Sequence, residues 1–108
     1  MKIMLATDNP SLEGKISDRF ARTSYFLIYD LENGNFQVID NSSIGTHGAG
    51  PKAVQLAIDN NVSAIISAIP GETAMEAIKE SKIKVYDGRG LNAKEAIEKF
   101  KSGEIKEI

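Results

Sequence analysis

An apolar run, Val62-Ser63-Ala64-Ile65-Ile66-Ser67-Ala68-Ile69, lies near the middle of the chain and stops at Pro70-Gly71. A run of this length with many β-branched residues is typical of a strand that is buried on both faces. Helical patterns lie on both sides of it, over residues 51–60 and 73–81. Strands and helices that alternate in this way indicate parallel strands joined by right-handed crossovers.

The two flanking helices have recognisable patterns. The helix from Pro51 to Asn60 places four apolar side chains on one face, namely Ala53, Val54, Ala57 and Ile58. The next helix runs to about Ser81, and Thr73 and Glu76 have the spacing of a capping box at its start. Both helices are therefore expected to pack one apolar face on a sheet.

The end of the chain repeats the alternation. Residues 83–86 read as a short strand, and Asp87-Gly88-Arg89-Gly90 follows as a glycine-rich turn. Asn92 and Glu95 form a second capping pair, which opens a helix that ends at Ser102-Gly103.

The first half of the chain has a different pattern. Residues 2–7 predict a buried strand, because residues 3–6 are continuously apolar. A polar loop over residues 9–23 follows. We expect it to be functional because of its length, and mobile because it holds few apolar residues before Asp18. Strands at 25–31 and 36–39 then form a hairpin about the turn Asn33-Gly34.

These elements predict an α/β fold in the order β, ββ hairpin, α, β, α, β, α. One mixed five-stranded sheet with one antiparallel strand and helices on its faces accommodates them. Ligands of such sheets bind beyond the carboxyl ends of the parallel strands, where the loops after residues 7, 69 and 86 should gather. Asp30 should point to the opposite edge, because it ends the antiparallel strand.

Composition limits the classes of function. The 108 residues include 42% hydrophobic and 26% charged residues, no cysteine, and a net charge of −2. These values predict a single globular domain over residues 1–108 and give no indication of nucleic-acid or membrane binding. No signal peptide is evident, so we expect a cytoplasmic protein. Without cysteine, the usual thiolate-ligated zinc and iron–sulfur sites are excluded.

A glycine-rich loop holds the only histidine, and it reads Gly45-Thr46-His47-Gly48-Ala49-Gly50-Pro51-Lys52. Pro51 suits the first position of a helix, and Gly50 suits its N-cap. Free N–H groups at a helix start and a closely approaching glycine backbone favour an anion. His47 can ligate a metal. The spacing departs from both the dinucleotide-binding and the Walker patterns, so neither site is expected.

Charged side chains add further candidates. The cations suited to contact an anion are Lys15, Arg19, Arg22, Lys52 and Arg89. Asp8 and Asp87 follow parallel strands and would converge at one edge, as in a divalent-metal nuclease. An ordinary solvated loop and turn-forming aspartates explain these residues as well.

Five segments in order carry a family resemblance: Ile16-Ser17-Asp18-Arg19-Phe20-Ala21-Arg22, Tyr25–Asp30, His47-Gly48-Ala49-Gly50, Ile83–Tyr86 and Ala93–Ile97. Together they resemble the dinitrogenase iron–molybdenum cofactor biosynthesis family, over nearly the whole chain. The resemblance implies a ribonuclease-H-like fold of three α/β/α layers. It also implies binding or carriage of an anionic metal–sulfur cluster, such as an iron–molybdenum cofactor or its precursor, without catalysis.

The resemblance also implies site residues and partners. The cofactor-binding residues by position are Arg19, Phe20, Arg22, His47 and Gly48, with Gly50 of the same loop, and His47 is the metal contact. A protein that donates or accepts the cluster is the implied partner. Two alternatives stay open, namely a small-anion or nucleotide-binding module that uses the same loop and a divalent-metal nuclease.

Overall fold

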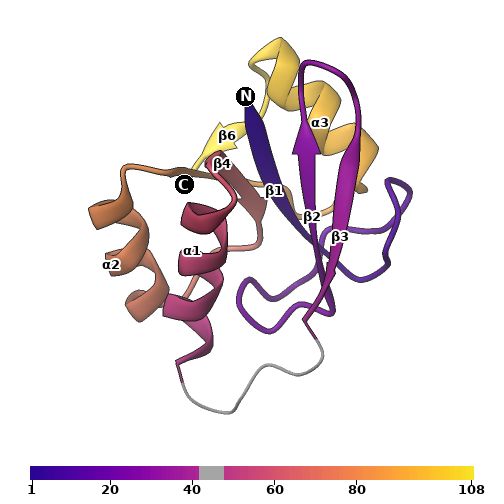
Figure 1. Cartoon of the computed structure of the whole chain (residues 1–108). Coiled ribbons are helices and arrows are strands. Elements are labelled where there is room, and N and C mark those ends of the chain that lie inside the picture. Colours follow the sequence, from indigo (N-terminus) through magenta and orange to yellow (C-terminus); the bar gives the residue numbers. More distant parts are fainter. Residues whose placement is uncertain (42–47) are drawn as a thin grey trace.

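A computed structural model describes residues 1–41 and 48–108 of the chain. Within these ranges, six strands form one sheet in the order β3-β2-β1-β4-β5-β6 (Figure 1). The elements are β1 (Lys2–Thr7), β2 (Tyr25–Asp30), β3 (Phe36–Asp40), α1 (Ala49–Asp59), β4 (Val62–Ser67), α2 (Glu72–Ser81), β5 (Lys84–Asp87), α3 (Ala93–Ser102) and β6 (Lys106–Glu107).

The α/β class and the mixed sheet agree with the sequence, but the prediction of five strands is wrong. β4 pairs in parallel with β1 and with β5, and the hairpin strand β2 is antiparallel to β1. The additional strand β6 is antiparallel to β5, so two described strands, β2 and β6, run opposite to β1. β6 has only two residues, both exposed, so no apolar pattern marks it.

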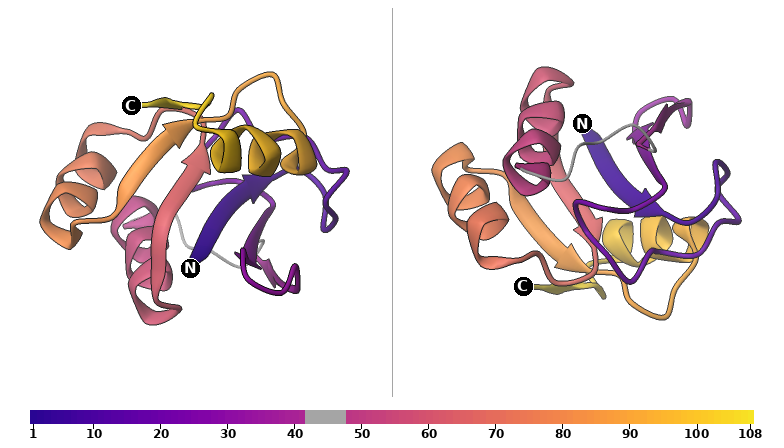
Figure 2. Two further views of the ribbon diagram at one scale, coloured as in Figure 1. Left: turned by 90° about the horizontal axis from the view of Figure 1, so that it is seen from above. Right: turned by 90° about the horizontal axis from the view of Figure 1, so that it is seen from below.

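Helices cover both faces of the sheet. Figure 2 shows α1 and α2 on one face and α3 on the other. The sequence of β1 is apolar at successive positions because both faces of this strand are buried. Met4 and Ala6 pack on the side of α1 and α2, whereas Ile3 and Leu5 pack on the side of α3. All four side chains are 0% exposed, so alternate residues of one strand serve two separate cores.

Two helix starts differ from the prediction. α1 is preceded by Gly48 as its N-cap, with φ of 71°, so Gly50 is inside the helix and Pro51 is its third residue. Proline is tolerated there because the N–H groups of the first turn have no partner within the helix. α2 has Gly71 as its N-cap and no side-chain cap, so the predicted capping box of Thr73 is wrong.

The capping box of α3 is confirmed. The Oδ1 atom of Asn92 accepts a hydrogen bond from the backbone N–H of Glu95 at 2.8 Å. The Oε1 atom of Glu95 accepts one from the backbone N–H of Asn92 at 3.0 Å. Both contacts are local, which is why the three-residue spacing of Asn92 and Glu95 is enough to predict them. No helix among the described residues is long and apolar enough to cross a membrane.

Candidate functional site

One edge of the sheet gathers most of the loops, as the strand order predicts. β1, β4 and β5 end there because they run parallel. β2 begins and β3 ends there, since Tyr25 pairs with Thr7 and Asp40 pairs with Tyr25. α1 and α2 begin at the same edge, at the bottom of Figure 1. Asp30 lies at the opposite edge, where it pairs with Lys2.

The loop after β1 is better anchored than its polar sequence indicates. The N–H of Ser17 donates to the Ala6 carbonyl at 2.9 Å, and the N–H of Ile16 donates to the Leu91 carbonyl at 2.9 Å. Ile16 is only 1% exposed and belongs to the core beneath α3. The loop is therefore held by backbone pairing and by separate buried side chains such as Ile16, rather than by a run of apolar residues.

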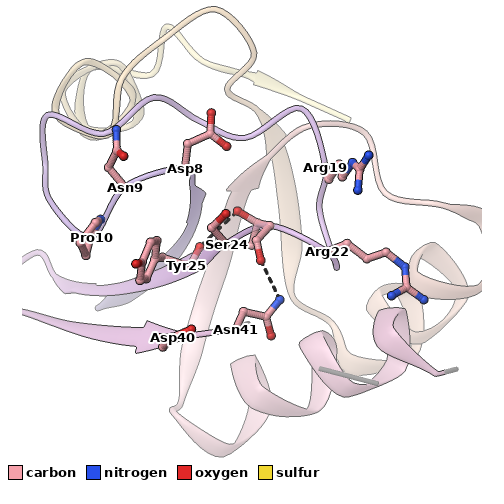
Figure 3. A pocket seen from close by; sticks show the side chains of 10 residues that line it. Asp8, Asn9, Pro10, Arg19, Arg22, Ser24, Tyr25, Asp40 and Asn41 are labelled. Carbon is pink, nitrogen blue, oxygen red and sulfur yellow. Dashed lines mark hydrogen bonds between the residues drawn. The ribbon is translucent and has the colours of Figure 1, made fainter. Parts of the chain in front are cut away.

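A polar pocket of about 660 Å³ opens at this edge. Figure 3 shows Arg19 and Arg22 on the same side of it, away from Asp40. The residues that line the pocket come from the first loop and from the strands β2 and β3: Asp8, Asn9, Pro10, Arg19, Arg22, Thr23, Ser24, Tyr25, Asp40 and Asn41. Only the charged residues of the first loop indicated a site in the sequence. Sequence analysis therefore missed the other lining residues, namely Asn9, Pro10, Thr23, Ser24, Tyr25, Asp40 and Asn41.

Arg22 is common to three neighbouring hollows. A second hollow, of about 250 Å³, is lined by both arginines and by Asp8, Ser17, Asp18 and Ser24. A third, of about 300 Å³, lies between Arg22 and the first turns of α1 and α2. α1 has no acidic residue in its own first turn, so no side chain of that turn offsets the partial positive charge of its free N–H groups. Glu72, in the first turn of α2, places a carboxylate at the same hollow.

The structure brings some of the sequence-predicted residues together and separates others. Arg19 and Arg22 are exposed and line the same pocket, and Gly48 and Gly50 line the hollow beside Arg22. Phe20 points the other way. It is 4% exposed, and its ring meets the Phe26 ring edge-on at a centroid distance of 6.4 Å. Phe20 therefore anchors the loop in the core instead of facing the pocket, because a large apolar ring is more stable there.

The glycine-rich loop is described only in part. His47 and residues 42–46 lie outside the described residues. Gly50 has a packing role, because a Cβ atom placed there would come within 2.9 Å of the Ala74 Cβ on α2. Its lack of a side chain lets the two helix starts approach each other closely. A Cβ atom added at Gly48 would meet no atom of the described residues within 4 Å, so this position requires glycine chiefly because of its positive φ.

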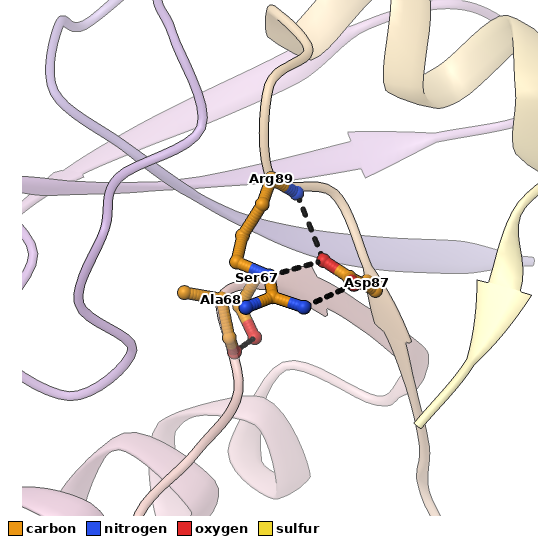
Figure 4. Close-up of polar contacts among 4 residues, drawn as sticks. All are labelled: Ser67, Ala68, Asp87 and Arg89. Atoms are coloured by element: carbon orange, nitrogen blue, oxygen red, sulfur yellow. Dashed lines mark hydrogen bonds and ion pairs between the residues drawn. The ribbon is translucent and has the colours of Figure 1, made fainter.

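The aspartate pair does not form the cluster that a nuclease would need. Asp8 lines the polar pocket, but Asp87 is two strands away across β4 and is engaged by Arg89 (Figure 4). The Arg89 guanidinium donates to the two carboxylate oxygens of Asp87 at 3.0 Å and 2.8 Å. Among residues 1–41 and 48–108, no group of three histidine or carboxylate side chains could hold a metal ion.

The ion pair has a testable effect on titration. Hydrogen bonds from the Arg89 side chain hold the pKa of Asp87 below its ordinary value, against a smaller opposing effect of burial. A lowered folded-state pKa stabilises the fold above the unfolded pKa of about 3.9, and this stabilisation is lost as pH falls through the folded value. We expect ¹³C NMR titration to show a lowered Asp87 pKa that rises in Arg89→Gln, because the hydrogen bonds from the Arg89 side chain are lost. An unchanged pKa in that variant would exclude Arg89 as the cause.

The chain is similar to one protein family over nearly its whole length. The sequence model of the family described as "Dinitrogenase iron-molybdenum cofactor" matches residues 1–103. A search of curated proteins finds no match.

Solved structures share the fold. The apo form of the orange protein from Desulfovibrio gigas has a TM-score of 0.90 and 25% identity, and the match covers 99% of this chain and 92% of that one. A Thermotoga protein described as a candidate NifB protein has a TM-score of 0.85 and 38% identity, with 98% and 91% covered. A candidate dinitrogenase from Methanocaldococcus jannaschii has a TM-score of 0.76 and 27% identity, with 100% and 94% covered.

Proposed function

The chain belongs to the dinitrogenase iron-molybdenum cofactor family, and on this basis we propose that it binds and carries an anionic metal–sulfur cluster without catalysing a reaction. The cargo is an iron–molybdenum cofactor, its precursor or a related cluster. The observation that supports this most is the place of Arg22, which lines three adjoining hollows and shares two of them with Arg19.

The guanidinium groups of Arg19 and Arg22 suit a large, diffuse anion, and they share their pocket with the carboxylates of Asp8 and Asp40. A guanidinium group is planar and weakly hydrated, so it gives up water more easily than an ammonium group when it meets a soft anion. The start of α1 adds N–H groups and partial positive charge beside Arg22. A pocket of about 660 Å³ is within the size range of sites for small molecules and cofactors.

The glycine-rich loop completes the proposed site. The resemblance assigns His47 as the metal contact, and its imidazole suits iron and other transition metals. Gly48, which follows directly, lines the hollow that also contains Arg22. The proposed site therefore combines the guanidinium groups of Arg19 and Arg22 with the imidazole of His47.

A carrier must also exchange its cargo. We propose that a cluster-donating or cluster-accepting protein is the partner and that the exchange takes place in the cytoplasm. The likeness to a protein that has been solved in an apo form supports a cargo that can leave. The ribonuclease-H-like assignment belongs to the same proposal, supported by the mixed sheet with helices on both faces.

The cargo class can be tested with tetrathiomolybdate, a soluble metal–sulfur anion. We expect the apo chain, titrated anaerobically with this anion alone and with ferrous iron, to retain a charge-transfer band at fixed stoichiometry after desalting. The band should be weaker in His47→Ala, because a metal ligand is lost. Absence of any retained chromophore in the unmodified chain would contradict cluster carriage.

A small-anion or nucleotide-binding module is the second candidate, because the hollow beside the α1 start suits a phosphate group. It predicts thermal stabilisation by phosphate or nucleotides without metal, and sensitivity to replacement of Lys52 or Arg22. The nuclease alternative has no comparable support, since Asp87 is paired with Arg89.

A further inference from the structure

Asn41 is half-buried immediately after β3 and faces the first loop. Its Nδ2 group donates hydrogen bonds to the Ala21 carbonyl at 2.9 Å and to the Thr23 carbonyl at 3.0 Å. Its backbone N–H donates to the Ser24 carbonyl at 3.0 Å. Asn41 therefore contacts the backbone on both sides of Arg22.

The backbone beside Arg22 is also linked by a hydrogen bond to the end of β1. Thr23 is 2% exposed, and its hydroxyl donates to the Thr7 carbonyl at 2.7 Å. The backbone around Arg22 is therefore fixed between the ends of β1 and β3, which come from distant parts of the sequence. Both N–H groups of the Asn41 amide are used on this segment, so the amide has no donor left for a ligand.

We propose that Asn41 is a positioning residue that fixes the backbone of Arg22 for binding of an anionic metal–sulfur cluster. This inference rests on the function proposed above. An exposed arginine gains affinity when its backbone is ordered before binding, because less conformational freedom is lost on binding. Asn41 has this effect without contacting the cargo, since its amide is directed at carbonyl groups that flank Arg22.

The test compares two asparagines that make the same kind of bond. Asn41→Ala removes both side-chain bonds and adds no charge. Asn60→Ala is the matched control, because the Asn60 Nδ2 also donates to a backbone carbonyl, that of Leu56 at 2.8 Å, at the far end of α1. In the cargo-free chain, ¹⁵N relaxation should show order parameters for residues 21–24 falling from about 0.85 to below about 0.6 only in Asn41→Ala. Unchanged order parameters would overturn the proposal, whether or not the chain binds a cluster.

A double-mutant cycle tests the link to Arg22. We expect Asn41→Ala to weaken tetrathiomolybdate binding about tenfold, as for loss of a group that orients a ligand, and Asn60→Ala to leave it unchanged. In the Arg22→Gln background, Asn41→Ala should have no further effect, because the group that it positions is gone. Equal losses in both backgrounds would show a merely structural role and refute the proposal. If the unmodified chain retains no tetrathiomolybdate, the proposed function fails, and the relaxation result alone decides whether Asn41 orders Arg22.

Discussion

Replacing Arg22 with glutamine is expected to weaken tetrathiomolybdate binding about 10- to 100-fold, the largest effect of any single change at the site. Arg22 lines all three hollows, so no neighbouring cation can replace it in each of them. A hydrogen bond to a charged group contributes about 1.5–3 kcal/mol, which corresponds to this range of affinity. Anaerobic titration followed by desalting and absorbance measures the change.

Arg89→Gln is the control for this prediction. It removes the same guanidinium group at the same edge, but Arg89 is held by Asp87 and lines none of the three hollows. Binding should remain within about twofold of that of the unmodified chain, because a solvent-exposed ion pair adds little to stability and Arg89 does not line the proposed site. Equal weakening in the two variants would mean that binding depends on net charge, and it would remove Arg22 from the proposed site.

Replacing Gly50 with alanine is expected to lower the free energy of unfolding by about 1–3 kcal/mol. In an open helix the same change would raise stability by about 0.5–1 kcal/mol, so the sign itself is diagnostic. Here the new Cβ would lie 2.9 Å from the Ala74 Cβ and 3.3 Å from the Ala74 Cα and backbone N. Because backbone atoms cannot swing aside, α1 and α2 must separate. Urea unfolding followed by circular dichroism measures the loss.

Gly71→Ala is the matched control, since Gly71 is the N-cap of α2 on the other side of the same hollow. It has a φ of −67°, and a Cβ added there would meet no atom of the described residues within 4 Å, so alanine fits without strain. Its cost should stay below about 1 kcal/mol. A stabilised Gly50→Ala chain would show that the helix starts do not pack as closely as described.

The elements predicted correctly from the sequence are those that local interactions or continuous burial determine. β1 and β4 are predicted well because both of their faces are buried, which requires an apolar residue at nearly every position. The α3 capping box is predicted because its two partners are three residues apart. The α1 start is misplaced by two residues, because a proline is tolerated at several positions of a first turn and Gly48 can adopt a positive φ.

The sequence alone determined the α/β class, the alternation of strands and helices, and a first loop with two arginines followed by a glycine-rich loop. Those features depend on residues that lie within a few positions of one another. Only the tertiary structure decided that Phe20 packs inward, that β6 extends the sheet, and that Asn41 holds the backbone beside Arg22. The Asn41 bonds join residues 18 and 20 positions apart, and they exist only because the strand order brings the end of β3 beside the first loop. No local pattern encodes that proximity, because it results from how the whole chain buries its two apolar cores.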